Sequence, residues 1–311
     1  MYFPYLYGKA AELRALRSLA NNLGTPQKIW PIVEPTKPAA PLKATLAEFK
    51  ASGAGMYLAI NPHRGELADS TAVTNWRNAL NGELADPALI RPTLLIETST
   101  TLAELRTFVA ANGGRNIGVV VTGNALPAPD LANALRGTSC IAFLDRHANR
   151  SAYAAALPAR STVDIEDNFI PKARNADYSG SDPQGTNHLT WASAAKAGFS
   201  DFTILPGTYS DSGGPMGALA IHLTYEHPTE LRLQHFVSIT QVQGTPLAPK
   251  FRESISALEV QIAATPARFR VSPAITDYQA MRASGQYTSA EKNKRLQIIH
   301  HLYTVGKILK I

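Results

Sequence analysis

The sequence predicts an α/β fold built around a parallel eight-stranded barrel of the (β/α)8, or TIM-barrel, type. Short apolar runs rich in β-branched residues alternate along the chain with Ala- and Leu-rich segments of helical spacing, which is typical of βα units. Eight such stations fall within about 250 residues, the usual length of this barrel. A hydrophobic content of 45% and a charged content of 17% indicate a globular chain with a sizeable core.

The expected strands are the apolar runs themselves. They span residues 29–33, 56–60, 93–96, 117–121, 141–144, 162–165 and 202–205, and a β-hairpin of 218–225 with 231–238 forms the eighth station. The hairpin connection contains a proline and polar side chains, as a turn requires. The segments between the stations are too long and too rich in alanine for strands. We expect helices at 42–50, 73–80, 102–111, 128–135 and 148–157.

Further helices are expected outside this pattern. A helix at 8–23 precedes the first station and is expected to close the bottom of the barrel. The eighth helix of the barrel is expected at 250–263, and two additional helices are expected at 274–283 and 289–310. In the last helix an apolar face and a basic face alternate. The apolar face carries Ile298, Leu302, Val305 and Leu309, and the basic face carries Lys294, Arg295, Lys307 and Lys310. We therefore expect a barrel domain over 1–265 and a basic helical extension over 266–311, packed on or beside it.

A doubly wound parallel sheet is the alternative to a barrel. Its dinucleotide-binding members carry a G-x-G-x-x-G turn after the first strand. The sequence contains neither that turn at this place nor a G-x-x-x-x-G-K-[ST] phosphate loop anywhere. The barrel is therefore the preferred prediction.

The cysteine content and the hydropathy indicate the cellular compartment. Cys140 is the single cysteine, which excludes an intrachain disulfide and a thiolate zinc cluster and indicates a reducing compartment. It lies in the apolar run 140–144, where a buried hydrophobic side chain is expected. The sequence has no apolar stretch long enough to span a bilayer and no signal-peptide pattern at its beginning. We expect a cytoplasmic protein with no membrane partner.

The positive charge is concentrated near the end of the sequence. The formal net charge is +6, from 30 Lys and Arg against 24 Asp and Glu. Residues 265–311 contain eight basic and two acidic residues, which leaves 22 of each in the rest of the chain. This distribution predicts a basic arm that could meet phosphate, nucleic acid or an acidic partner. A solvated helix face is the alternative, because no aromatic-interleaved nucleic-acid motif accompanies the charge.

Acidic residues follow several expected strands. Active sites of TIM barrels form at the carboxyl ends of the strands. Four acids occupy such positions and are the candidate catalytic residues: Glu34, Glu97, Asp145 and Glu166. Together they could bind a divalent cation such as Mg²⁺, or act as general acid and base. Capping of the following helix explains any single acid equally well.

His222 is a further candidate catalytic residue. It lies in an expected strand on the same side as Thr224, and it faces His235 if Glu226 pairs with Leu231 across the hairpin. Such a pair could hold a ligand, whereas a hydrogen-bonded structural pair is the alternative. No H-E-x-x-H, H-x-H or E-x-x-H spacing indicates a zinc or di-iron site.

Two loops are candidate ligand-binding segments. The loop after the seventh station contains hydroxyls and two adjacent glycines, and loops at this place in barrels often bind phosphate through backbone N–H groups. Its candidate residues are Tyr209, Ser210, Asp211, Ser212, Gly213 and Gly214. The glycines could instead simply turn the chain. The loop over 167–178 is long for a βα connection. It contributes Lys172 and Arg174, which could neutralise an anion, together with Asn175 and Asp177.

Several of these segments carry a family resemblance. The relevant segments are 1–9 with Glu12, Leu13, Ala15 and Leu16, then 31–35, 174–178, 198–202, 209–215 and 220–225. Their order and spacing resemble the phage Beta-protein-like family, from Met1 to about Ser238. The resemblance implies a TIM-barrel-like fold encoded in prophages and mobile elements, at loci of defence or exclusion and often beside a nuclease-like neighbour. It carries over no catalytic residues.

Three functions follow as expectations. The first is a component of a bacterial anti-phage or mobile-element conflict system, which acts with a protein encoded by a neighbouring gene and binds a phosphate-bearing ligand at the barrel mouth. The second is a metal-assisted TIM-barrel phosphodiesterase or lyase that uses the carboxylates at the strand ends. The third is nucleic-acid binding through the basic tail, with an affinity that falls steeply with salt.

Overall fold

The computed structural model describes residues 1–211 and 216–311, which form two compact units. The first unit comprises Met1–Lys9, Ala20–Asp167 and Asn187–Phe202. The second comprises Ala10–Leu19, Asn168–Thr186 and Thr203–Ile311. The domain boundary at residue 265 stays a prediction.

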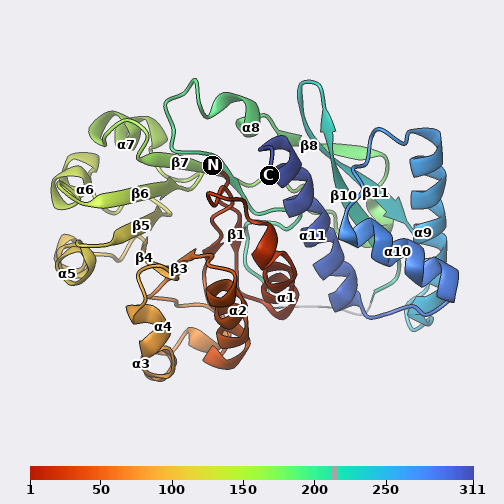
Figure 1. Ribbon diagram of the computed structural model, residues 1–311, viewed down its shortest axis with the longest axis horizontal. Helices are drawn as coiled ribbons and strands as arrows, with labels where there is room; N and C mark the ends of the chain where they lie inside the picture. The colour runs from red at the N-terminus through yellow and green to blue at the C-terminus, as the bar shows by residue number, and fades with distance from the viewer. Residues whose placement is uncertain (212–215) are drawn as a thin grey trace. The chain divides into compact units, whose positions relative to one another are not determined.

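The first unit contains an eight-stranded parallel sheet in its described residues (Figure 1). Tyr2 forms parallel bridges with both Ile29 and Phe199, which join the two ends of the sheet. The sheet is therefore a nearly closed barrel, and the predicted fold class is confirmed. In sheet order the strands are β1 (Tyr5–Leu6), β2 (Ile32–Val33), β3 (Met56–Ala59), β4 (Ile90–Ile96), β5 (Asn116–Val121), β6 (Ser139–Leu144), β7 (Thr162–Glu166) and β9 (Ser200–Asp201).

Within the described residues the number of barrel strands agrees with the prediction, but the segments that form the first and the eighth strand differ from it. The first barrel strand is β1, which lies before the expected first station and has only two residues, too few to show a periodic pattern. The eighth barrel strand is β9, which ends directly before the expected seventh station at 202–205, and the hairpin lies outside the barrel sheet. Consequently the helix expected to precede the first strand follows it, as α1 (Ala10–Leu19).

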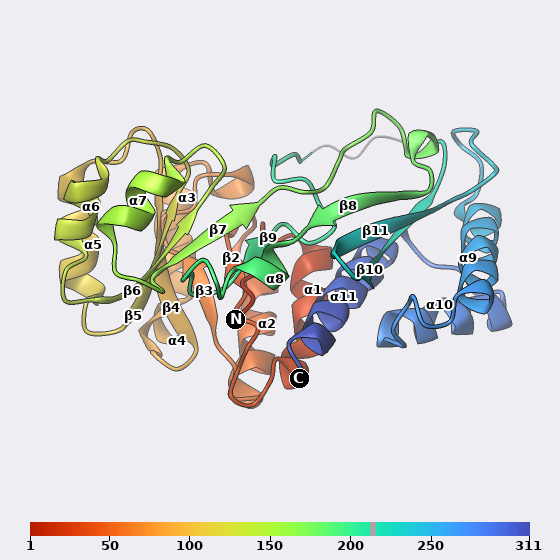
Figure 2. The same ribbon diagram turned by 90° about the horizontal axis from the view of Figure 1, so that it is seen from above.

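Helices connect the strands of the first unit, as βα units require, and Figure 2 shows α5, α6 and α7 along one side of β5, β6 and β7. The helix α5 begins with a capping box, in which the Thr101 hydroxyl accepts from the Glu104 backbone N–H and the Glu104 carboxylate accepts from the Thr101 backbone N–H. The helices are α2 (Ala39–Ala51), α3 (Ser70–Ala79), α4 (Asn81–Ala85), α5 (Leu102–Asn112), α6 (Ala128–Ala134), α7 (Arg150–Ala156) and α8 (Asn187–Thr190), with 3-10 turns at Ala20–Asn22 and Gly65–Leu67.

Aromatic side chains fill the barrel interior. The rings of Phe3, Tyr57 and Phe143 meet edge to face, with centroids 5.0 to 5.9 Å apart. Gly118 of β5 faces them, and a Cβ at this position would lie 2.8 Å from both Thr93 Oγ1 and Tyr57 Cδ1. The bulk of the neighbouring rings therefore requires glycine here.

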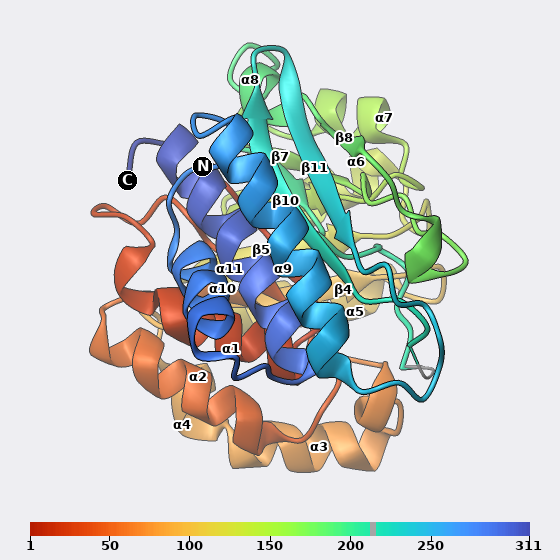
Figure 3. The same cartoon turned by 90° about the vertical axis from the view of Figure 1, so that its right-hand side faces the viewer.

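The second unit contains a three-stranded antiparallel sheet in the order β10 (Ala220–His227), β11 (Glu230–Val237) and β8 (Ser181–Gly185). Glu226 pairs with Leu231 and His222 pairs with His235, so the predicted hairpin register is confirmed. Figure 3 shows three helices of this unit in front of β10 and β11. They are α9 (Leu247–Ala264), α10 (Pro273–Ser284) and α11 (Ala290–Ile308), and a 3-10 turn lies at Asn175–Asp177.

The helix α11 is a buried element of the second unit and packs against α1 and β10. On its apolar face Ile298, Leu302 and Val305 are fully buried. Its polar side chains serve the edge of the sheet: Asn293 and Gln297 donate to the Ala220 carbonyl, and His300 Nε2 lies 2.8 Å from the Thr224 carbonyl. Side chains of α11 therefore satisfy carbonyls that the edge strand β10 would otherwise leave unpaired.

Several basic residues near the end of the chain have partners within the second unit. Arg270 pairs with Glu226, Arg282 lies 3.6 Å from Glu259, and Lys292 lies 3.9 Å from Asp277. The Arg268 guanidinium lies 4.9 Å from the centroid of the Tyr225 ring. Lys294, Lys307 and Lys310 are exposed, as predicted for the basic face, whereas Arg295 is half-buried. The basic segment is therefore an integral part of a folded unit.

Among the described residues, no helix combines the length and the apolar character needed to cross a bilayer.

Candidate functional site

Glu34 is a buried carboxylate at the carboxyl end of β2. Only 2% of it is exposed, and it accepts hydrogen bonds from the Tyr5 hydroxyl at 2.5 Å and from Arg64 Nε at 2.8 Å. Burial raises the pKa of Glu34, while the Tyr5 hydrogen bond and the charges of Arg64 and His63 act in the opposite direction. The Tyr5 and Arg64 donors are what make a carboxylate tolerable at this depth.

Arg64 connects Glu34 to a second predicted acid, Glu97, at the end of β4. Arg64 Nη2 lies 3.5 Å from Glu97 Oε1, and His63 Nε2 lies 2.8 Å from the same oxygen. The side chains of His63, Arg64 and Glu97 are each about one-third exposed, at 34%, 33% and 32%. We call Tyr5, Glu34, His63, Arg64 and Glu97 the mouth cluster. It combines one buried and one accessible carboxylate with a cation and an imidazole.

The other two predicted acids lie elsewhere in the first unit. Asp145 Oδ1 accepts the backbone N–H of His147 at 2.9 Å, which closes a local turn after β6. Glu166 lies on the outer side of β7, where Arg150 Nη1 contacts it at 2.7 Å. Arg150 also donates to the Ile165 and Asp145 carbonyls. Glu166 thus fixes α7 against the sheet, and within the described residues neither acid contacts the mouth cluster.

A second polar cluster lies in the second unit, around the predicted pair of His222 and His235. Their Nδ1 atoms are 2.7 Å apart, and His235 Nε2 lies 3.1 Å from Asp182 Oδ2. Phe169 and Tyr178 cover His222, with ring centroids 5.6 and 4.6 Å from its own. Burial lowers the pKa of His222 to about 3, with a smaller effect from His235. Burial also lowers the pKa of His235, so both rings are neutral at neutral pH, as a hydrogen-bonded structural pair requires.

The predicted residues of the long loop lie partly beside this pair. The Tyr178 hydroxyl accepts the backbone N–H of Lys172 at 3.1 Å, and the charge of Lys172 helps to lower the pKa of His235. Asn175 Nδ2 donates to the Ala218 carbonyl at 3.0 Å, which ties the loop to the segment before β10. The loop therefore packs against the histidine pair through Tyr178, which the sequence analysis did not single out.

The remaining candidate ligand residues are exposed or not described, except Tyr209, which is half-buried. Arg174 and Asp177 pair with each other at 2.6 Å, and Arg174 is 75% exposed. The Tyr209 hydroxyl donates to Asp211 Oδ1 at 2.5 Å, and Ser210 lies between them. Ser212, Gly213 and Gly214 lie outside the described residues. The proposed phosphate loop therefore stays a prediction.

The donor set bears on the predicted divalent cation. Within residues 1–211 and 216–311, no three His, Cys, Asp or Glu side chains gather so that they could hold a metal ion. In the mouth cluster both carboxylates accept from protein donors instead. Cys140 offers no thiolate either, because burial raises its pKa to about 12.

Three residues of the mouth cluster were absent from the predicted site. Tyr5 lies in a two-residue strand, and His63 and Arg64 come several residues after the end of β3. His63 also follows an expected strand, three residues after 56–60, but the signal that identified Glu34 and Glu97 is an acidic residue at a strand end. The alternation of Tyr5 and Tyr7 was the available signal for β1, since alternate residues of a strand face the same side.

The chain was compared with protein-family models and with curated proteins, and it matches none of either. The resemblance to the phage Beta-protein-like family therefore stays a prediction.

Proposed function

We propose that this protein is an enzyme that carries out acid–base chemistry, as a lyase or hydrolase, at the carboxyl-terminal mouth of its barrel. The observation that carries this proposal is the mouth cluster, in which Arg64 bridges the buried Glu34 and the accessible Glu97, and His63 lies 2.8 Å from Glu97. Carboxyl ends of barrel strands are the usual place for such a site.

His63 is the proposed general base. When its Nε2–H donates to Glu97, its Nδ1 keeps a lone pair, and this atom has no protein partner in the part of the chain that the structure describes. A substrate proton taken up at Nδ1 would create an imidazolium, which the adjacent Glu97 carboxylate stabilises. Glu97 therefore orients the base and offsets its charge.

Arg64 is the proposed electrostatic group. Glu34 holds its Nε and Glu97 holds its Nη2, while Nη1 has no partner among the described residues. A guanidinium fixed in this way can stabilise negative charge that develops on a substrate, and it suits a phosphate group. Glu34 and Tyr5 are positioning residues, because they act through Arg64.

The metal-assisted alternative finds less support in this geometry. It needs Glu34, Glu97, Asp145 and Glu166 to turn their oxygens toward one cation. Glu166 instead pairs with Arg150 on the outer side of β7, and Glu34 is occupied by Tyr5 and Arg64. We therefore favour catalysis by the side chains themselves.

For the biological setting we propose a bacterial anti-phage or mobile-element conflict system, in which the protein acts with a partner encoded by a neighbouring gene. Its support is the sequence resemblance. A phosphate-bearing ligand is compatible with this setting and with the chemistry of Arg64.

A phage-plating assay tests the setting and the site together. The protein is expressed with its genomic neighbours, and His63→Gln is compared with His147→Gln, an exposed histidine outside the mouth cluster. We expect His63→Gln to abolish protection and His147→Gln to retain it, with circular dichroism showing that both variants fold. Full protection by His63→Gln contradicts the proposed site.

Nitrogen-15 NMR tests the chemistry separately from the setting. Long-range correlation spectra of the imidazoles should show His63 protonated at Nε2 and bare at Nδ1, and Glu97→Gln should change this tautomer balance. A His63 protonated at Nδ1 excludes it as the base, even if the phage assay succeeds. If the wild type gives no protection against phage while His63 has the expected tautomer, the proposed anti-phage role is wrong and the proposed role of His63 as a base is unaffected.

A further inference from the structure

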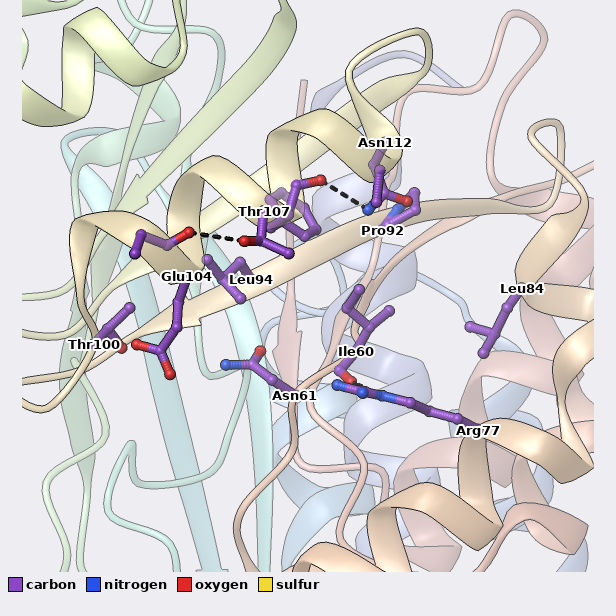
Figure 4. Close-up of a pocket in the computed structure, with 13 residues that line it drawn as sticks. Ile60, Asn61, Arg77, Leu84, Pro92, Leu94, Thr100, Glu104, Thr107 and Asn112 are labelled. Atoms are coloured by element: carbon purple, nitrogen blue, oxygen red, sulfur yellow. Dashed lines mark hydrogen bonds between the residues drawn. The ribbon is translucent and has the colours of Figure 1, made fainter.

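An open pocket lies on the outer side of the barrel in the first unit, between α3–α4 and α5 (Figure 4). Its volume is about 640 Å³, which falls within the range of small-molecule sites. Pro92 and Leu94 of β4 line it, together with Phe108, Ile60 and Leu84. The lining is thus largely apolar and is supplied by three consecutive parts of the barrel.

Small side chains on α5 keep this space open. Ala103, Thr107 and Ala111 recur every four residues and line the pocket along one stripe of the helix. On the opposite side the helical layer is interrupted, since α3 ends at Ala79 and α4 contains only five residues. Longer side chains on α5 would fill the volume, so the pocket depends on this composition.

Most polar side chains that line the pocket are already engaged by the protein. Asn61 exchanges two hydrogen bonds with the backbone of Leu95, at 2.8 and 2.9 Å. Thr107 donates to the Ala103 carbonyl and Asn112 to the Phe108 carbonyl, each at 2.9 Å (Figure 4). Thr100 accepts the backbone N–H of Glu97 at 2.9 Å. These groups therefore offer little to a polar ligand.

Arg77 is the exception. Its Nε donates to the Ile60 carbonyl at 2.7 Å, which fixes the guanidinium beside Ile60 and Asn61 at the edge of the pocket (Figure 4). Its two Nη atoms have no partner, and its charge has no acidic counterpart, among the described residues. Arg77 is an exposed residue whose guanidinium is covered in part by the protein, which lowers its pKa, yet a guanidinium stays charged in proteins. An anion would supply the missing counter-charge.

Glu104 limits how much negative charge the pocket accepts. Its Oε2 accepts from the Thr101 backbone N–H at 2.7 Å and from the Thr101 hydroxyl at 2.8 Å, which lowers its pKa and keeps it ionised. In Figure 4 it lies beyond Asn61 from Arg77. A second anionic group on a ligand would meet this charge, whereas an apolar tail would meet the floor formed by β4.

We propose that this pocket binds an amphiphilic monoanion, an aliphatic carboxylate with its carboxylate on Arg77 and its chain over Leu94 and Phe108. The carboxylate would use the open Nη atoms of a fixed cation. The chain would fill the apolar pocket and cover the half-buried side chains of Ile60 and Leu84. This site is separate from the mouth cluster, so it stands or falls independently of the proposed chemistry.

Isothermal titration calorimetry with decanoate tests the proposal on the full chain. We expect saturable binding to the wild type and about tenfold weaker binding to Arg77→Met, because a hydrogen bond to a charged group is lost. Arg106→Met is the matched control, since Arg106 is an exposed arginine of α5 that does not line the pocket. It should bind decanoate like the wild type.

Two further measurements separate the charge from the cavity. Ala111→Trp and Thr107→Phe should each abolish decanoate binding by filling the pocket. Two such variants are used so that the test still holds if one of them fails to fold. Decan-1-ol should bind equally to the wild type and to Arg77→Met, because it carries no charge. Unchanged decanoate binding in both filled variants, or tighter binding of decyltrimethylammonium than of decanoate, overturns the proposal.

Discussion

His222 and His235 face each other across β10 and β11, with their Nδ1 atoms 2.7 Å apart. One nitrogen of such a pair must carry the hydrogen and the other must accept it. Asp182 accepts from Nε2 of His235, which leaves Nδ1 of a neutral His235 as the acceptor and assigns the shared hydrogen to His222. Protonation of both rings would place two hydrogens between the Nδ1 atoms, so this contact is lost once both histidines are charged.

We expect the second unit to lose stability in acid. Burial lowers the pKa of His300 to about 4 and that of His222 to about 3, below the value near 6.5 of an unfolded chain. The unfolded state therefore takes up protons first, and stability that is present above about pH 6.5 is lost as the pH falls. For His300 alone the loss between pH 7 and pH 4 is on the order of 3 kcal/mol.

Urea unfolding followed by far-UV circular dichroism at several pH values checks this prediction. His300→Gln should show a shallower decline with falling pH than the wild type, because the glutamine amide cannot titrate. His227→Gln changes an exposed histidine at the hairpin turn and should follow the wild-type curve. Parallel curves for His300→Gln and the wild type would contradict the assignment of His300 as a neutral buried group.

The histidine pair shows which features the sequence could specify. Alternation along a hairpin and a turn at its tip fix which residues oppose each other, and this local information sufficed for His222 and His235. Asp182 comes from β8, which pairs with β11 only in the folded unit. The hairpin sequence contains no signal for Asp182, so the hydrogen bond between His235 and Asp182 could not be predicted together with the histidine pair.

Loss of the Arg64 side chain is expected to leave the buried Glu34 carboxylate without its cationic partner. Arg64→Met leaves Glu34 buried with only the Tyr5 hydroxyl, which should cost about 1–3 kcal/mol of unfolding free energy at pH 8. The pKa of Glu34, already raised by burial, should rise further in this variant. A carboxyl group with a raised folded-state pKa is protonated first in the folded state, so the deficit should shrink as the pH is lowered to 5.

Urea unfolding monitored by tryptophan fluorescence at pH 8 and pH 5 measures both effects. Lys37→Met is the control, because it breaks the exposed ion pair with Glu66 and should change stability by less than about 1 kcal/mol. An Arg64→Met deficit of equal size at both pH values would show that Glu34 is not the group left unpaired.

The candidate acids illustrate a second limit of the sequence. All four follow or end apolar runs, yet Glu34 and Glu97 meet at Arg64 while Glu166 faces the helices. A one-residue difference in strand phase decides which side of a barrel strand a residue faces. The parallel strands are buried on both sides and read as continuous apolar runs, so their phase was not visible.

The role of α11 predicts that a change in its polar face disrupts the sheet. Asn293→Leu removes the donor to the Ala220 carbonyl and the acceptor of the Tyr278 hydroxyl, at 3.0 and 2.7 Å. The Ala220 carbonyl keeps only the longer hydrogen bond from Gln297, and the Tyr278 hydroxyl keeps only the backbone carbonyl at position 293, each at 3.3 Å. The loss of two buried hydrogen bonds should cost about 1–3 kcal/mol. Hydrogen exchange of the β10 amides should accelerate in this variant. Lys294→Leu, at the exposed neighbouring position, should leave the exchange of the β10 amides unchanged. If the β10 amides exchange equally slowly in both variants, the polar side chains of α11 are not needed to hold β10 in the sheet.

Gly118 gives the sharpest test of how the barrel is packed. Its missing side chain leaves room for Tyr57, Thr93 and Phe143, and the nearest of their atoms would lie 2.8 Å from an added Cβ. Gly118→Ala should therefore destabilise the first unit by about 1–3 kcal/mol, because the rings must leave their preferred edge-to-face positions. Gly114→Ala is the matched control, since no atom lies within 4 Å of a Cβ there. Urea unfolding by tryptophan fluorescence compares the two. If both variants unfold at the same urea concentration, the barrel interior can accommodate an added methyl group, and the aromatic packing does not explain the glycine in β5.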